Sequence, residues 1–384
     1  MTADPPNLAR PLEGLRVLDF TALLPGPLCT LHLADLGAEV IKVESPKAPD
    51  GGRGLPGQQF SKMFMMLARG KQCVAVDLRE PAGQAAIARL AATCDVVVEG
   101  FRPGVAERLG IGFARLSAEH PALVYCSISG YGQTGPMRDA GGHDINYQSL
   151  AGVLDQQGTA GGPPAPGNFP AADIAGGALS ATVGILAAVL GARRHGRGCH
   201  VDVSMTDCLM AQNLSAAMTL QSAGRAAPRG GDYLSGGLPC YGTYATSDGR
   251  YMALGALEPK FWQNFCQAVD RPDLLPLGHV MGREAAAAKA AIAAVIAART
   301  QAEWVAAFRD VDACFTPVLT LAEALDSPQA QARGLVRRVD HPQGGAHWQY
   351  ASPWRFNGEA PPPPAREAVG VGADNAALLG QAVQ

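Results

Sequence analysis

Residues 15–44 read LRVLDFTALLPGPLCTLHLADLGAEVIKVE, and this stretch decides the fold class. Its first six residues, 15–20, are mostly apolar and predict a buried strand. Pro25 suits the first position of a helix, which we expect to continue through Asp35 and to end at Gly37. Residues 38–44 predict a second strand. A strand, a helix and another strand in this order form a βαβ unit, whose two strands are parallel.

The same alternation continues along the first half of the chain. Strands are predicted at residues 71–78, 95–99 and 123–129, and an amphipathic helix at residues 80–94. This order predicts an α/β fold, a doubly wound Rossmann-like sheet, whose ligands bind at the carboxyl ends of the strands. In this chain those ends lead into Arg102, Ser129 and the glycines that follow them.

The second half of the chain has a different pattern. A chain of 384 residues is long for one core, so two domains are expected. Two strands around Ser-Asp-Gly at 247–249 form a hairpin signal, and helices are predicted over 258–269, 283–299 and 300–308. The last of these helices starts with the capping box Thr300-x-x-Glu303. We therefore expect a smaller α+β domain over residues 226–330, with short strands returning afterwards.

Composition excludes several classes of protein. The formal net charge is −3, with 31 basic and 34 acidic residues, whereas nucleic-acid and membrane-surface binders carry an excess of Lys and Arg. We therefore expect no nucleic-acid partner and no membrane partner. Nine cysteines without a C-x-x-C pair form neither a disulfide framework nor a zinc motif. Scattered thiols suit a reducing compartment, so a cytoplasmic location is expected. The N-terminal residues lack the apolar run of a signal peptide.

Residues 174–191, IAGGALSATVGILAAVLG, carry no charge and approach the length of a membrane span. The stretch is rich in Ala, Gly, Ser and Thr and has no flanking aromatic anchors. Both features favour a buried core helix over a membrane helix.

The first candidate site is Gly141-Gly-His143-Asp144-Ile-Asn-Tyr147. Glycines allow a ligand to approach the backbone closely. Asp144 can cap a helix running to about Leu154, which places His143 at the amino-terminal edge of that helix, where free N–H groups can bind an oxyanion. The simpler alternative is an ordinary helix cap beside an incidental histidine.

Two further carboxyl groups are candidates. Asp173 directly precedes the apolar stretch 174–191, so desolvation would raise its pKa and allow it to exchange protons. The alternative is another helix cap. Glu258 lies in Gly255-Ala-Leu-Glu-Pro259, where the helix dipole favours a glutamate whether or not it has a catalytic role.

A cationic turn, Glu99-Gly100-Phe101-Arg102-Pro-Gly104, follows a strand and is followed by Arg108. Backbone amides and guanidinium groups there could bind a polyphosphate, although exposed arginines are also common on surfaces. The chain has no G-x-G-x-x-G after its first strand, no Walker A loop, no G-x-S-x-G and no metal-ligand spacing. Spacing alone therefore assigns no chemistry.

Taken together, these stretches resemble the family III CoA-transferase superfamily over nearly the whole chain. The resemblance rests on five motifs: PLEGLRVLD at 11–19, LGAEVIKVE at 36–44, GFRPG at 100–104, SGYGQTGP at 129–136 and VDVSM at 201–205. Within the superfamily the chain is most similar to the α-methylacyl-CoA racemases, through GHDINY at 142–147, Asp173 and GALEP at 255–259.

The resemblance implies a fold and a set of roles. It implies a large Rossmann-like domain formed by residues 1–225 and 331–384, a small domain between them, and an interlocked homodimer with each active site between two chains. It makes His143 and Asp173 the catalytic acid/base pair and Glu258 the residue that orients the histidine. It places the CoA thioester, which is the substrate, against Val76, Asp77, Leu78, Arg79, Gly100, Phe101, Arg102, Arg108, Gly142, Asp144, Ile145, Asn146 and Tyr147.

This chain departs from the family pattern at two positions. Ser45 stands where the racemases often have an arginine for the adenine end of CoA, and Lys42 or Lys47 could substitute for it. Ala172 stands where a glycine commonly precedes the aspartate. The first departure concerns the contact with the adenine end of CoA.

The resemblance implies interconversion of (2R)- and (2S)-2-methylacyl-CoA by removal and return of the α-proton through an enolate, with no metal or redox cofactor. A first alternative is a CoA-transferase with Asp173 as nucleophile. A second is a non-catalytic acyl-CoA-binding or scaffold subunit. Methyl-branched fatty acids, sterol side chains and arylpropionyl groups all remain open as the acyl group.

Overall fold

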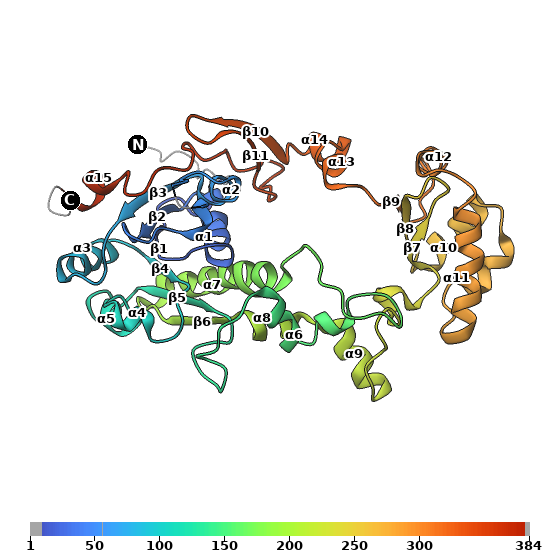
Figure 1. Cartoon of the computed structure of the whole chain (residues 1–384), viewed down its shortest axis with the longest axis horizontal. Coiled ribbons are helices and arrows are strands. Elements are labelled where there is room, and N and C mark those ends of the chain that lie inside the picture. The colour runs from blue at the N-terminus through green and yellow to red at the C-terminus, as the bar shows by residue number, and fades with distance from the viewer. Residues whose placement is uncertain (1–9, 56, 381–384) are drawn as a thin grey trace. The chain divides into compact units, whose positions relative to one another are not determined.

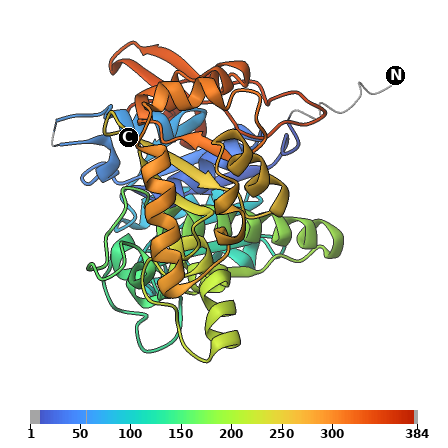
Figure 2. The same ribbon diagram turned by 90° about the vertical axis from the view of Figure 1, so that its right-hand side faces the viewer.

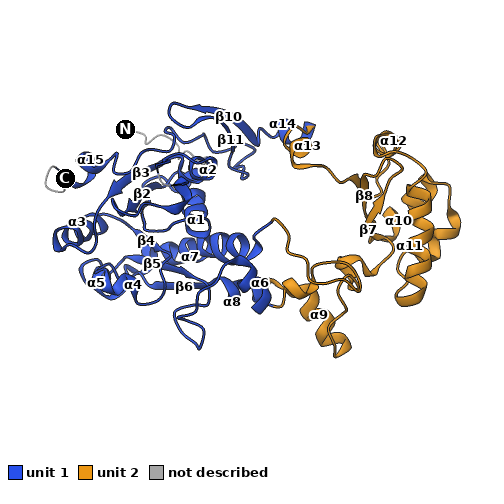
Figure 3. Cartoon of the chain, viewed as in Figure 1, with its two compact units in different colours: residues 1–151, 169–211, 328–384 blue, residues 152–168, 212–327 orange. Residues whose placement is uncertain are grey.

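The computed structural model describes residues 10–55 and 57–380, and most of the N-terminal stretch that lacks a signal-peptide pattern lies outside them. The chain divides into two compact units (Figure 3). Unit 1 contains residues 1–151, 169–211 and 328–384, and unit 2 contains residues 152–168 and 212–327. These limits differ from the predicted domain boundaries at 225/226 and 330/331, chiefly because residues 152–168 and 212–225 belong to unit 2.

Unit 1 is built on one parallel sheet of six strands in the order β3-β2-β1-β4-β5-β6 (Figure 1). All neighbouring strands pair in parallel. The strand order reverses between β1 and β4, as it does in Rossmann folds, so the predicted α/β class is confirmed. The strands are β1 (Arg16–Asp19), β2 (Glu39–Glu44), β3 (Lys71–Ala75), β4 (Val96–Glu99), β5 (Val124–Ser129) and β6 (His200–Ser204).

Helices cover the sheet, and the C-terminal segment closes one edge. At that edge Asp374 accepts a hydrogen bond from the Cys73 N–H at 2.8 Å, and Asn375 bonds both backbone groups of Ala75. The C-terminal segment therefore pairs with backbone groups of Cys73 and Ala75 on the edge strand β3.

The helices of unit 1 are α1 (Pro25–Asp35), α2 (Lys62–Ala68), α3 (Pro81–Ala91), α4 (Val105–Arg108), α5 (Phe113–Glu119), α6 (Asp144–Leu150), α7 (Ser180–His195), α8 (Met205–Gln212, which ends at the unit boundary), α14 (Pro328–Ala332) and α15 (Asn375–Leu379). Unit 1 also contains an antiparallel hairpin of β10 (Val336–His341) and β11 (Gly345–Tyr350).

The apolar stretch forms one continuous helix of 24 residues, Ala172–His195, whose first part, Ala172–Leu179, is wound as a π-helix and continues into α7. By length and composition alone it could cross a membrane. In the fold, Ala181, Ile185 and Val189 are buried, as expected for a helix that packs on the sheet. The prediction of a core helix is wrong for the opposite face, because Val183 and Leu190 are exposed.

Unit 2 contains a three-stranded antiparallel sheet in the order β7-β8-β9, namely Tyr241–Ala245, Tyr251–Gly255 and Phe315–Pro317. Its core packs aromatic rings of Trp262, Phe265 and Phe315 against one another. The capping box of Thr300 and Glu303 is present as predicted. The helices are α9 (Leu214–Ala223), α10 (Pro259–Ala268), α11 (Gly282–Ile296), α12 (Gln301–Ala307) and α13 (Leu321–Leu325) (Figure 2).

A buried carboxylate, Asp19, ends the central strand β1 and is fully shielded from solvent. It forms an ion pair with Lys71 of β3 at 3.2 Å. Its oxygens also accept hydrogen bonds from the Thr21 N–H and hydroxyl and from the Thr30 hydroxyl on α1, at 2.5–2.9 Å. Burial raises the pKa of Asp19, but Lys71 and then Lys42 outweigh burial and hold the net pKa below its usual value. The carboxylate is therefore ionised and joins β1, β3 and α1.

Lys42 takes part in this network and is almost fully buried. Its ammonium group forms an ion pair with Asp50 at 2.8 Å and donates to the Thr21 carbonyl at 2.7 Å. Its charge and its donors serve the fold, and the suggestion that Lys42 could hold the adenine end of CoA stays a prediction.

Lys71→Met should lower the free energy of unfolding by about 3–5 kcal/mol, because it leaves a buried carboxylate without its partner. The measurement is urea unfolding at neutral pH. A matched control is Arg271→Met, which removes a cation from an exposed pair with Asp273 at 2.6 Å and should cost less than about 1 kcal/mol. Equal losses in the two variants would contradict the structural role assigned to the Asp19 network.

Candidate active site

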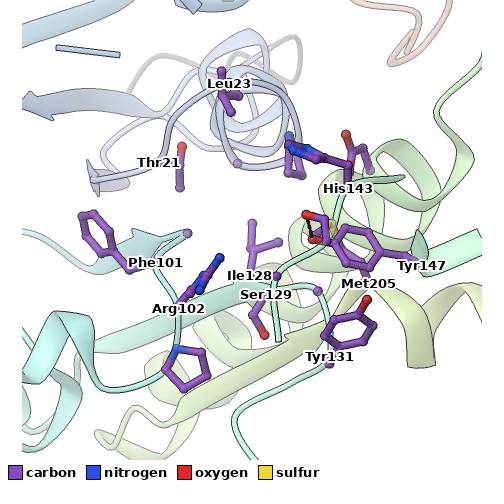
Figure 4. A pocket seen from close by; sticks show the side chains of 18 of the residues that line it. Thr21, Leu23, Phe101, Arg102, Ile128, Ser129, Tyr131, His143, Tyr147 and Met205 are labelled. Carbon is purple, nitrogen blue, oxygen red and sulfur yellow. Dashed lines mark hydrogen bonds between the residues drawn. The ribbon is translucent and has the colours of Figure 1, made fainter. Parts of the chain in front are cut away.

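A cavity of about 250 Å³ opens in unit 1 at the carboxyl ends of β1, β4 and β5 (Figure 4). Residues that end or follow these strands line it, namely residues 21–23, 25–26, 100–103 and 128–131. The remaining wall comes from Arg138, residues 140–143, Tyr147, Asp173 and Met205. Parallel sheets bind ligands at this edge, where the strand order reverses.

The cavity brings together many of the residues singled out from sequence. These are Gly100, Phe101, Arg102, Ser129, Gly142, His143, Tyr147 and Asp173. They come from four segments that together extend over more than seventy residues of the chain, so the fold brings them together. Thr21, Leu23, Tyr131, Arg138 and Met205 also line the cavity and were not singled out.

His143 occupies the N-cap of α6, and its own N–H donates to the Asn146 side chain at 3.0 Å. The prediction that Asp144 caps this helix is wrong, because the histidine takes that position. The helix also ends at Leu150 rather than near Leu154. The imidazole lies at the cavity wall and its residue is exposed, so a ligand can reach it (Figure 4).

Asp144 instead caps a different helix. One carboxylate oxygen accepts hydrogen bonds from the N–H groups of Ala172 and Asp173, at 2.7 and 3.0 Å. The other accepts from the Gln148 side chain at 2.5 Å. The side chain of Asp144 is therefore bonded within the protein, and Asp144 lines neither this cavity nor the second one described below.

Asp173 lies in the first turn of the helix that Asp144 caps and is partly buried. Burial raises the pKa of its carboxyl group, the nearby charge of Asp144 raises it further, and His143 lowers it, so that the pKa is about 6. A carboxyl group with this pKa can both lose and gain a proton near neutral pH.

Glu99, the last residue of β4, stabilises the turn that follows this strand. This residue is buried, and its carboxylate accepts the Phe101 N–H at 2.7 Å. Burial raises the pKa of Glu99 to about 7, although the Ser127 hydroxyl and the Phe101 N–H act in the opposite direction. The bond fixes the backbone between Glu99 and Arg102, whose exposed guanidinium group lies against Gly141.

Tyr147 forms part of the cavity floor. Its hydroxyl donates to the Gly142 carbonyl at 2.5 Å, and its ring meets Tyr131 edge-on with 5.2 Å between centroids. Burial raises the pKa of Tyr147 to about 12, so the hydroxyl stays protonated. Gly130 and Gly142 face this ring so closely that an added Cβ at either position would collide with it.

A second cavity, of about 370 Å³, adjoins the first and shares Thr21, Ala22 and Phe101 with it. Residues 76–79 line it as the resemblance implied for CoA, together with Ser45 and Lys47. Lys47 is mostly exposed and lies 3.4 Å from Asp77, which is also paired with Arg79 at 2.7 Å. The racemases often have an arginine at the position of Ser45. Lys47 therefore remains a candidate to supply the positive charge for the adenine end of CoA.

Some predicted residues line neither cavity. Arg108 ends α4 and is exposed, and Ile145 and Asn146 lie on α6 next to Asp144. Glu258 belongs to unit 2, where it is the exposed N-cap of α10. Its predicted role beside His143 stays a prediction.

Comparisons with known proteins agree on the family of this chain. The family model described as CoA-transferase family III matches residues 12–375. The alpha-methylacyl-CoA racemase of Homo sapiens is 38% identical over 325 residues, covering 84% of this chain and 81% of that protein. The succinyl-CoA:glutarate CoA-transferase of Mus musculus is 32% identical over 368 residues, covering 92% and 84%. The crystal structure of a CAIB/BAIF family protein from Brucella suis superposes with a TM-score of 0.81 at 28% identity, covering 97% and 99%.

Gly130→Ala should lower the free energy of unfolding by about 1–3 kcal/mol, because its Cβ would overlap the Tyr147 ring and displace the cavity floor. Thermal or urea unfolding measures this loss. Gly191→Ala is the matched control, since open space surrounds that position on α7 and alanine favours a helix by up to about 1 kcal/mol. A Gly130→Ala protein as stable as the control would contradict the tight packing at Tyr147.

Proposed function

The chain belongs to CoA-transferase family III, and from this membership we propose that it is an isomerase that interconverts (2R)- and (2S)-2-methylacyl-CoA thioesters. The observation that supports this most is that His143 and Asp173 line one cavity, with Asp173 at a pKa of about 6. The racemase relatives of Homo sapiens and Mus musculus support the same reaction.

The proposed mechanism is a transfer of one proton at the carbon next to the thioester. That proton is a weak acid, and its removal gives an enolate whose charge spreads onto the thioester oxygen. His143 removes the proton from one epimer while protonated Asp173 delivers a proton to the opposite face. In the reverse direction the two groups exchange roles.

The enolate oxygen needs hydrogen-bond donors, and the backbone amides at the start of α6, next to Asp144, are the proposed source. A helix amino terminus suits a developing negative charge. The proton leaves and returns at the same carbon and the thioester delocalises the charge, so the proposed reaction requires no metal or redox cofactor.

The CoA part of the substrate is proposed to occupy the second cavity, beside residues 76–79. Arg102 at the first cavity, with Arg79, Arg108 and Lys47 nearby in unit 1, would supply cations for its phosphates. Glu258 keeps the proposed role of orienting His143. The nine cysteines are all free thiols, which supports a reducing, cytoplasmic location.

A CoA-transferase remains the second candidate, because relatives such as succinyl-CoA:glutarate CoA-transferase are 32% identical over 368 residues. Asp173 would then attack an acyl group as a nucleophile. An acyl exchange through one carboxylate does not need a second proton carrier, whereas the proposed isomerase needs His143 as well as Asp173.

His143→Ala and Asp173→Asn should each lower the rate of epimer interconversion by at least about 10²-fold, because each removes one of the two proton carriers. The measurement is loss of the α-proton of both 2-methylacyl-CoA epimers in heavy water, with chiral analysis of the product. A His143→Ala protein that exchanged both epimers at the wild-type rate would rule out the mechanism.

The same proteins separate the two candidates. Hydroxylamine added with acyl-CoA should leave Asp173 unmodified in an isomerase and should trap it as a hydroxamate in a transferase. Trapping at Asp173, together with CoA transfer to a carboxylic acid and no α-proton exchange, would replace the isomerase by the transferase. Wild-type protein without either activity on a broad panel of acyl-CoAs would favour a binding or scaffold role.

A homodimer is proposed as the assembly of this chain. The ten-residue helix α9 has no buried residue, and its Leu214, Met218 and Leu220 side chains are exposed. Apolar side chains of this number on one short helix indicate a surface that another protein covers.

The protein should elute with twice its chain mass of 39.8 kDa when light scattering follows size-exclusion chromatography. Replacing Leu214 and Met218 together by Glu should shift the mass toward one chain, because charges would have to be buried at the interface. Leu321→Glu, at another exposed apolar position, is the control and should leave the mass unchanged. A wild-type mass of one chain would contradict the homodimer.

A further inference from the structure

One side chain links the two helices that carry the proposed proton carriers. His143 caps α6, and Asp144 is the first residue of that helix. Asp173 lies in the first turn of the helix Ala172–His195. The carboxylate of Asp144 spans the two, by accepting the N–H groups of Ala172 and Asp173.

We infer that Asp144 is a positioning residue that sets both the place and the proton affinity of Asp173 relative to His143. This inference rests on the proposed function, since it assigns Asp144 a task within that reaction. It concerns the side chain of Asp144, and the contact with CoA that the resemblance implied for this residue stays a prediction.

The geometry gives this carboxylate little freedom. Its Oδ1 bonds two consecutive backbone amides, at 2.7 and 3.0 Å, and its Oδ2 accepts from Gln148 at 2.5 Å. Gln148 is itself buried, at 3% exposed, one turn further along α6. A carboxylate held at both oxygens transmits the position of α6 directly to the first turn of the other helix. The two N–H groups are also ones that a helix start leaves without a partner.

The charge of Asp144 acts on Asp173 as well. An amino-terminal helix turn by itself stabilises a carboxylate and so favours the ionised form of Asp173. Asp144 places a negative charge at the same turn and works against this effect. Besides burial, Asp144 is the group that raises the pKa of Asp173, and His143 is the group that lowers it.

Other titratable groups lie on the elements around Asp173 but have other partners or lie across the cavity. Asp202 accepts from the Gln133 N–H, and the Cys29 thiol accepts from the Thr182 hydroxyl. The remaining charged or titratable groups of the cavity wall and of α8 are Arg102, Tyr131, Arg138, Tyr147, Asp207 and Cys208. The pair Asp144 and His143 therefore dominates the electrostatic environment of Asp173.

The sign of the effect follows from the reaction. One proton shared between His143 and Asp173 is the active form in both directions, so activity should fall on both sides of a pH optimum. At low pH both His143 and Asp173 are protonated, so neither can accept the α-proton and the enzyme is inactive. Removing the charge of Asp144 makes Asp173 give up that proton more readily. The acid side of the pH–rate profile should therefore move to lower pH.

The experiment compares Asp144→Asn with Asp144→Ala in the full-length protein. The asparagine can still accept from the two backbone amides but carries no charge, whereas the alanine loses both the bond and the charge. Protein labelled with ¹³C at the aspartate carboxyl groups, with Asp173 assigned through Asp173→Asn, reports the pKa of Asp173 by NMR titration. This readout needs no turnover.

Asp144→Asn should lower the pKa of Asp173, shift the acid limb of kcat/KM to lower pH and reduce kcat by up to about tenfold. Asp144→Ala should reduce kcat by about 10²-fold, the size of effect expected when a reacting group is displaced by about 1 Å. The control is Asp232→Asn, since Asp232 caps another helix start through the Tyr233 N–H at 2.8 Å. It should change stability without changing the acid limb.

An unchanged pKa of Asp173 in Asp144→Asn would overturn the electrostatic part of the inference, and wild-type kcat in Asp144→Ala would overturn the positioning part. A wild-type protein that exchanges no α-proton would contradict the proposed function instead. In that case the NMR titration still decides whether Asp144 sets the proton affinity of Asp173.

Discussion

A carboxylate buried at the end of the central strand constrains the rest of unit 1. Asp19 is shielded from solvent, so its charge must be balanced inside the protein, and Lys71 and two threonine hydroxyls do this. Thr21 is the first residue of the loop that lines both cavities. The shape of the cavity wall is therefore set by ion pairing in the core, before any ligand binds.

The site itself balances opposing effects on one carboxyl group. The helix start and His143 favour ionised Asp173, while burial and Asp144 favour its protonated form. Because neither side dominates, the pKa of Asp173 is about 6 and both forms are accessible near neutral pH. A similar compromise holds at Glu99, where burial opposes the hydrogen bonds that fix the cationic turn.

Local patterns in the sequence predicted what depends on local order. Hydrophobic runs located five of the six parallel strands, and glycine-flanked polar residues located His143 and the turn at Arg102. β6 was missed as a strand because His200 and Asp202 are exposed and polar, so the strand lacks a continuous apolar run. The ion pair of Lys42 was not predicted, because its partner Asp50 becomes a neighbour only through folding. Asp144 was misread for the same reason, since the helix that it caps starts 28 residues later.

The relatives include both racemases and CoA-transferases, so the cavity must be read for what separates the two chemistries. A raised pKa does not separate them, because a more basic carboxylate is both a better proton acceptor and a better nucleophile. His143 does separate them. A nucleophilic carboxylate forms and breaks its bond to the acyl group by itself, whereas inversion at carbon needs a donor on one face and an acceptor on the other. The proposed isomerase rests on that second requirement, for which the reachable imidazole of His143 and the carboxyl group of Asp173, lining one cavity, are the candidate pair.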